Sequence, residues 1–154
     1  MRDADELTEL LAAEGEQVLA RLFEFYDRLP ALDPGSLRGA WEGGCFRTGH
    51  PGERQLETIG WVGKAFHGDD DVDPILSRGE DGGRIVNPIM GKASLRSVTY
   101  RGVTTATMIY DRHPIFDHFR RVDDDTILGV MDRKGDAFPL FFYLRRAPAA
   151  VDAP

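Results

Sequence analysis

Hydrophobic residues in the first thirty positions recur at helical spacing. The stripe runs at steps of three and four and consists of Val18, Leu22, Phe25 and Leu29. Gly15 interrupts the pattern, and Pro30 ends it because proline cannot continue a helix. Residues 1–30 are therefore predicted to form an amphipathic N-terminal helical segment whose wide apolar face must be covered.

From Gly39 onward the pattern changes to short strands separated by turns. The runs "GKASLRSVTYRG" and "GVTTATMIYD" meet at Arg101-Gly102, which is typical of a tight hairpin turn. Further runs, "HFRRV", "TILGVMD" and "AFPLFFYLRR", are joined by "DDD" and "RKGD". Many short strands joined by turns predict an antiparallel meander, and closing it removes exposed edges. We expect a β-barrel domain over 37–146 and a disordered tail over 147–154.

The last predicted strand is apolar on both faces. Phe138, Leu140, Phe142 and Leu144 alternate with Phe141 and Tyr143. Both faces should therefore be covered, one by the barrel interior and the other by the N-terminal helix.

A short helix is predicted between the first two strands. Pro51 stands at a suitable first helical position, and Leu56 and Ile59 follow three residues apart. Residues 51–60 are expected to form a small helical lid.

Charge and cysteine content narrow the function classes. The chain of 154 residues is one domain by length, and its net charge of −7 without a basic block argues against nucleic acid or an anionic membrane as a partner. The single cysteine, Cys45, cannot form an intrachain disulfide or a cysteine-based zinc cluster. Because no signal peptide or transmembrane run is visible, a cytoplasmic location is expected.

The stretch "RGAWEGG" places Trp41 two residues from Gly39 and two from Gly43. Glycines beside a large aromatic residue suit neither a helix nor an ordinary strand. They fit a strand that bends, or one where another backbone approaches the indole. We expect Trp41 to plug the bottom of the barrel.

Two resemblances follow from these residues. "GAWEG" fits the signature of the GXWXG family of small bacterial proteins, and "PIFDHFRRVDDDTILGVMDRKG" with "FFYLRR" resembles the domain of unknown function that usually follows it. The same features are similar to calycins (lipocalins and fatty-acid-binding proteins), in which an arginine near the last strand packs across a G-x-W tryptophan. Arg145 or Arg146 occupies that place, and Arg145 is assigned with Gly39, Trp41 and Gly43 to barrel closure.

The predicted fold is thus mainly β: a small antiparallel calycin-like barrel with an N-terminal amphipathic helix and a short helical lid. Its interior could be a packed core or a cavity, and the resemblance favours a cavity. The residues expected to contact a ligand are His50, Trp61, Lys64, Phe66, Met90, Met108, Tyr110, His118, Phe119, Met131 and Phe142. Lys64 could reach a carboxylate or phosphate head group, or extend to the rim.

The leading hypothesis is non-catalytic binding or transport of a hydrophobic or amphiphilic small molecule, such as a fatty acid or phospholipid, without a cofactor. One alternative is a haem-binding barrel with redox or nitric-oxide chemistry, in which His118 or His50 would hold the iron. Another is an enzyme for a hydrophobic substrate with Asp111 or His118 as base. A homodimer that exchanges the N-terminal helix is a further alternative.

No catalytic residue or metal site is assigned. The serines lack a nucleophile-elbow context, and His113 and His118 do not have the spacing of a helical zinc motif. Asp111 and Asp117 could form an acid pair, but structural ion pairs with the nearby arginines are favoured for them; these arginines are Arg112, Arg120 and Arg121.

Overall fold

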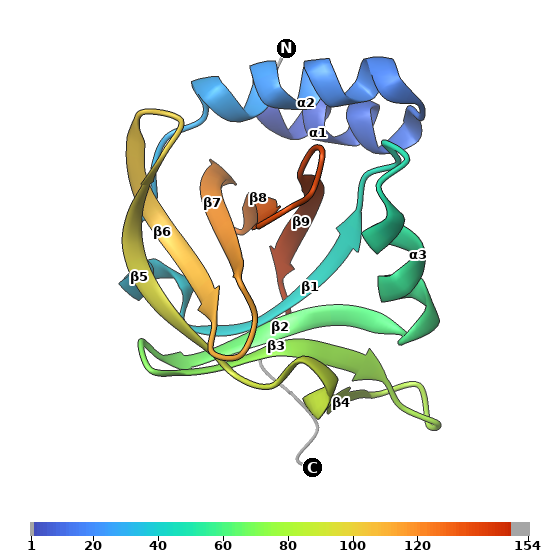
Figure 1. Ribbon diagram of the computed structural model, residues 1–154, viewed down its shortest axis with the longest axis vertical. Coiled ribbons are helices and arrows are strands. Elements are labelled where there is room, and N and C mark those ends of the chain that lie inside the picture. Colours follow the sequence, from blue (N-terminus) through green and yellow to red (C-terminus); the bar gives the residue numbers. More distant parts are fainter. Residues whose placement is uncertain (1, 149–154) are drawn as a thin grey trace.

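Eight antiparallel strands close into a barrel in the computed structural model, which describes residues 2–148 (Figure 1). The strand order is β2-β1-β9-β8-β7-β6-β5-β3, the pairing of β2 with β3 closes the ring, and β4 extends β3 outside it. This confirms the predicted fold class. The strands are β1 (Gly39–Cys45), β2 (Trp61–Gly68), β3 (Asp71–Arg78), β4 (Arg84–Val86), β5 (Ala93–Tyr100), β6 (Val103–Tyr110), β7 (Ile115–Asp123), β8 (Thr126–Arg133) and β9 (Leu140–Arg146).

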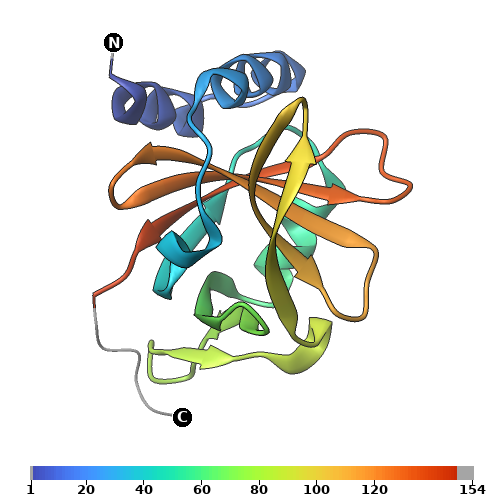
Figure 2. The same ribbon diagram turned by 90° about the vertical axis from the view of Figure 1, so that its left-hand side faces the viewer.

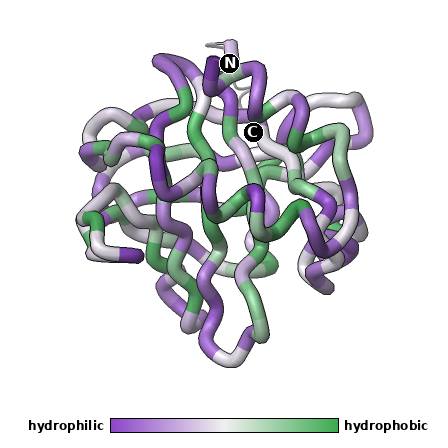
Figure 3. The backbone as a smooth tube through the Cα atoms, turned by 90° about the horizontal axis from the view of Figure 1, so that it is seen from above, coloured by the Kyte–Doolittle hydropathy of each residue, from purple (hydrophilic) through white to green (hydrophobic). Residues whose placement is uncertain are grey.

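The hairpin of β5 and β6 forms where the sequence predicts it. Arg101 and Gly102 both have positive φ, 51° and 80°, the conformation that a two-residue hairpin turn with the twist of the flanking strands requires. Pairing runs without interruption from Ala93 with Tyr110 to Tyr100 with Val103. The backbone coloured by hydropathy shows hydrophobic and hydrophilic residues interspersed along the chain (Figure 3).

The N-terminal segment is two helices rather than one, α1 (Asp3–Ala12) and α2 (Glu16–Arg28). Gly15 separates them with φ 110°, a backbone angle that favours glycine. Two views show the pair together on one side of the barrel (Figures 1 and 2). Their apolar faces form a cluster with the outer face of the sheet, which includes Val130 and Phe141. Both faces of β9 are therefore covered, as its sequence predicts.

Arg120 joins α2 to the barrel wall. Its side chain is fully buried, and Nη1 donates to the carbonyl oxygens of Tyr26 (3.0 Å) and Leu29 (2.9 Å) at the end of α2. The guanidinium also lies 4.4 Å from the centre of the Tyr26 ring. A buried arginine thus satisfies carbonyl groups that a helix leaves without partners at its C-terminus.

Trp41 belongs to the barrel core and contacts the residues that precede β1. Its side chain is buried, and its Nε1 donates to the carbonyl oxygen of Leu37 at 2.8 Å, at the end of the short helix η1 (Pro34–Leu37). The guanidinium of Arg146 lies 4.3 Å from the ring centre and donates to backbone oxygens of Arg38 and Ser36. The cation therefore stacks on the indole and holds the adjacent loop.

The assignment of Arg145 to this contact is wrong. Arg146 pairs directly with Trp41 in the β1–β9 register, so the two side chains share a face of the sheet. Arg145 pairs with Glu42 on the opposite face, and its guanidinium lies 4.9 Å from the centre of the Tyr143 ring.

Gly43 has a packing role that explains the second glycine of the motif. A Cβ atom there would lie 2.6 Å from the Trp61 indole and 2.9 Å from the Tyr143 carbonyl oxygen. The first glycine, Gly39, has φ 110°. One glycine thus permits the backbone turn into β1, while the other leaves room for a second tryptophan.

The predicted lid is α3 (Pro51–Thr58), two residues shorter than expected. His50 caps it: Nδ1 accepts from the amide of Gly52 at 2.8 Å, and Glu53 accepts from the amide of His50 at 2.9 Å. His50 Nε2 lies 2.9 Å from the Asp136 carboxylate in the β8–β9 loop. Leu56 packs on the barrel core, so α3 is fixed to the barrel at both its start and its apolar face.

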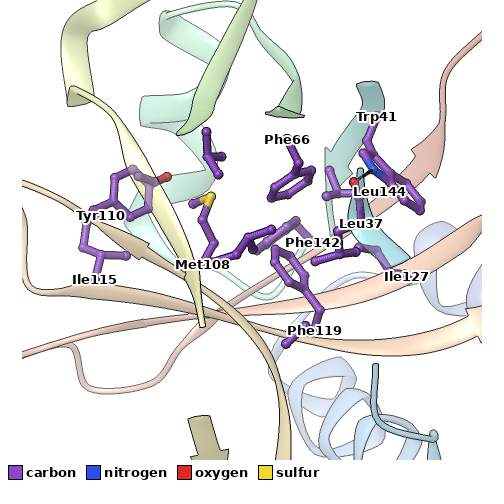
Figure 4. Packing of buried hydrophobic residues seen from close by; sticks show 14 of the residues in the cluster. Leu37, Trp41, Phe66, Met108, Tyr110, Ile115, Phe119, Ile127, Phe142 and Leu144 are labelled. Atoms are coloured by element: carbon purple, nitrogen blue, oxygen red, sulfur yellow. Dashed lines mark hydrogen bonds between the residues drawn. The ribbon is translucent and has the colours of Figure 1, made fainter. Parts of the chain in front are cut away.

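Hydrophobic side chains pack against one another in the barrel interior. Phe119 stands between Phe66 and Phe142 with edge-to-face contacts of 6.0 and 5.9 Å between ring centres (Figure 4). Met108 and Leu144 belong to the same cluster. Among the described residues, no helix has the length and hydropathy needed to cross a membrane.

Candidate functional site

An open groove runs along α3 on the outside of the barrel. It encloses about 1690 Å³ between α3, the start of α2 and the residues that follow β1. Cys45, Leu56, Trp61 and Phe138 provide apolar lining. Cys45 and Trp61 also pack on the barrel interior, so these two residues separate the groove from the core.

Lys64 and Asp117 form an ion pair inside the barrel. Lys64 Nζ lies 3.2 Å from Asp117 Oδ2 and donates to the carbonyl oxygen of Pro74 at 3.1 Å. Both side chains are no more than 3% exposed. In the register of β7, Asp117 stands between Met108 of β6 and Met131 of β8, so it faces the interior with them. The predicted arginine partner of Asp117 is therefore wrong, and the partner is the lysine of β2.

Three aromatic rings surround the ammonium of Lys64. Their centres lie 5.5 Å (Trp61), 5.7 Å (Tyr110) and 5.3 Å (Phe142) from Nζ. Tyr110 and Phe142 extend from different strands into the interior beside Met108 (Figure 4). Cation–π attraction supplements the carboxylate in holding this charge away from water.

Burial and pairing act in opposite directions on both charges. Burial raises the pKa of Asp117, and the Lys64 ammonium lowers it again. Burial likewise lowers the pKa of Lys64, while Asp117 raises it. Burial is the larger effect on both pKa values, and each partner offsets part of the cost of burying the other's charge.

Two polar atoms near this pair have unmet hydrogen-bonding capacity. Asp117 Oδ1 and Trp61 Nε1 are buried and find no hydrogen-bond partner among the residues that the structure describes. An unsatisfied buried donor or acceptor costs about 1–3 kcal/mol. The site thus presents one acceptor and one donor to any polar group that enters, water included.

Cys45 is a neutral thiol at this site. Burial raises its pKa to about 12; the charges of Glu53 and Asp117 add smaller increases, and the charge of Lys64 opposes them. Because the nucleophilic form of cysteine is the thiolate, Cys45 does not offer nucleophilic chemistry at neutral pH.

The predicted ligand residues fall into three groups. Trp61, Lys64, Tyr110 and Phe142 gather around the ion pair. The others in the barrel core or at its margin are Phe66, Met90, Met108, Phe119 and Met131. His50 caps α3 and lines the groove beside it, whereas His118 lies on the outer face of the barrel. Sequence reasoning missed Asp117 and Cys45 as interior residues, although a lone carboxylate in the apolar run "PIFDHF" is a usable signal.

His118 lies on the outer face of the barrel, between the inward-facing Asp117 and Phe119. Its ring stacks on Tyr100 with 4.0 Å between centres. Nδ1 lies 3.0 Å from Thr107 Oγ1 and Nε2 3.4 Å from the Asp132 carboxylate. Both ring nitrogens of His118 are therefore engaged, as are those of His50, and these two residues do not fit the role of haem ligands.

Stability should fall in mild acid because of His118. Burial lowers its pKa, and Asp132 only partly offsets this. The pKa of a histidine in the unfolded chain is about 6.5. Below that pH the unfolded chain binds a proton that the folded chain does not, so the free energy of unfolding decreases as the pH is lowered. We expect His118→Gln to reduce this slope by up to about 1.4 kcal/mol per pH unit. Urea unfolding at pH 7.5, 6.5 and 5.5 measures it, and equal slopes in both proteins would refute the assignment.

Comparisons with known proteins agree with the motifs. Residues 24–82 match the family described as GXWXG protein, and residues 91–146 match a domain of unknown function, DUF4334. The crystal structure of a protein from Thermomonospora curvata is 40% identical, with a TM-score of 0.87 over 96% of this chain and 100% of that chain. No curated protein matches the chain. The chain therefore carries a GXWXG domain followed by a DUF4334 domain and belongs to the same family as the Thermomonospora curvata protein.

Proposed function

We propose that this protein binds a hydrophobic or amphiphilic small molecule at the α3 end of its barrel, without catalysing a reaction. The observation that carries the proposal is the buried Lys64–Asp117 pair, with Asp117 Oδ1 and Trp61 Nε1 unsatisfied, behind a groove lined by both apolar and charged side chains. Binding sites of this kind combine apolar walls with a few convergent polar groups. Carriage of the ligand and kinship with lipocalins are part of the same proposal.

The packed core determines how a ligand would enter. Phe66, Phe119 and Phe142 fill the middle of the barrel, so an apolar tail lies in the α3 groove and only the head passes Trp61 toward Lys64. Tail burial contributes about 0.8 kcal/mol per CH₂ group. A fatty acid and a phospholipid are the first ligand classes to test.

Native mass spectrometry of freshly purified protein, followed by solvent extraction, tests the proposal directly. We expect an amphiphile that co-purifies, and displacement of the fluorescent probe N-phenyl-1-naphthylamine by it. Leu56→Glu in the groove should weaken probe binding by about tenfold, since it places a charge where the tail lies.

The matched control is Ile89→Glu. Ile89 is 60% exposed and does not line the groove. Probe binding should be unchanged in this variant. Absence of any co-purifying molecule together with absence of probe binding would contradict the proposal, as would equal effects of the two substitutions.

A further inference from the structure

We infer that the head group selected by this site is uncharged and carries both a hydrogen-bond donor and an acceptor, as a primary amide or an alcohol does. The inference rests on the proposed function and narrows its ligand class. It departs from the expectation that Lys64 meets a free carboxylate or phosphate.

The ion pair is already neutral. Asp117 lies 3.2 Å from Lys64, so the lysine charge has its counter-charge within the protein. A carboxylate that entered would add a negative charge to a site where no net positive charge is available. An unpaired charge in an apolar interior is strongly unfavourable.

The groove adds repulsion for anions. Its charged lining consists of Glu14, Glu16, Glu53 and Glu57 against Arg47 and Arg54, which gives four negative and two positive charges, or −2. A fatty-acid anion or a phospholipid phosphate would approach against this field.

The two unsatisfied atoms specify the polarity of the head group. Trp61 Nε1 donates and needs an acceptor, while Asp117 Oδ1 accepts and needs a donor. Both residues contact the Lys64 ammonium: Asp117 through its other oxygen at 3.2 Å, and Trp61 through its ring at 5.5 Å. An amide carries both an acceptor C=O and a donor N–H, whereas an ammonium lacks the acceptor and a carboxylate lacks the donor.

The test compares three ligands with the same tail: decanamide, decanoate and decylamine. Displacement of N-phenyl-1-naphthylamine is measured with each at pH 7.5. We expect decanamide to bind at least about tenfold more tightly than decanoate and decylamine. Tighter binding of decanoate or decylamine overturns the inference but leaves the proposed function standing, whereas binding of none of the three contradicts both.

Asp117→Asn gives the second arm. This substitution keeps the side-chain shape but leaves Lys64 without its counter-charge, so decanoate should now bind more tightly than decanamide. An unchanged ranking in a folded variant overturns the inference.

Trp61→Phe provides a third measurement that does not depend on the buried charge. It retains an aromatic ring and removes the donor, so decanamide affinity should fall by roughly tenfold. An unchanged decanamide affinity would show that Trp61 Nε1 does not meet the head group, and would overturn the inference.

Discussion

Asp117→Leu is expected to lower the free energy of unfolding by about 3–5 kcal/mol, because it leaves Lys64 buried without a counter-charge. The double variant Lys64→Met/Asp117→Leu should lie within about 1 kcal/mol of the wild type, since removing both charges also removes their desolvation cost. Urea unfolding of the wild type, the two single variants and the double variant forms a complete cycle that isolates the pair.

An exposed ion pair supplies the control. Arg21 Nη2 lies 2.9 Å from Glu9 Oε1 in the N-terminal helices, with both side chains more than 40% exposed. Arg21→Met should change stability by no more than about 1 kcal/mol. If Asp117→Leu is as mild as Arg21→Met, Lys64 is not held in the interior as a charge.

Gly63→Ala is expected to lower the free energy of unfolding by about 3 kcal/mol or more, at least as much as a typical substitution that overpacks a protein core. A Cβ atom at Gly63 would clash with the carbonyl oxygen of Trp41 in the neighbouring strand. Because the obstructing atom belongs to the backbone, relief requires β1 and β2 to separate where Trp41 pairs with Lys64. Thermal unfolding followed by near-ultraviolet circular dichroism would report both the stability and the tryptophan packing.

Gly68→Ala is the matched control in the same strand. A Cβ there meets nothing closer than an Arg38 guanidinium nitrogen at 3.9 Å. Its effect should stay within about 0.5 kcal/mol. If both variants lose a similar amount of unfolding free energy, the cause is the low strand propensity of alanine in β2 and not the close approach of the Trp41 backbone.

Local sequence patterns were sufficient to predict the barrel and the helix α3. Arg101-Gly102 marks a hairpin by its own chemistry, and Pro51 marks the start of α3, so both could be predicted from neighbouring residues. The apolar residues on both faces of β9 likewise predicted that both faces of this strand are buried. In each case the signal and the structure it determines lie within a few residues.

The site depended on register, which the sequence does not display. Lys64 and Asp117 meet only because β2 and β7 face each other across a closed barrel, so a nearby arginine was the more natural partner to predict. Arg145 and Arg146 differ only in which face of β9 they occupy, and a shift of one residue exchanges them. The interruption at Gly15 was visible in the sequence, and α1 and α2 are divided there.

The seam between β1 and β9 has a consequence for biosynthesis. Because Trp41 in β1 pairs with Arg146 in β9, almost the whole domain must leave the ribosome before the barrel can close. Until then, the apolar face of α2 is not covered by Phe141. The nascent polypeptide is thus exposed to aggregation throughout translation, and its dependence on chaperones should exceed that of a helical bundle of equal size.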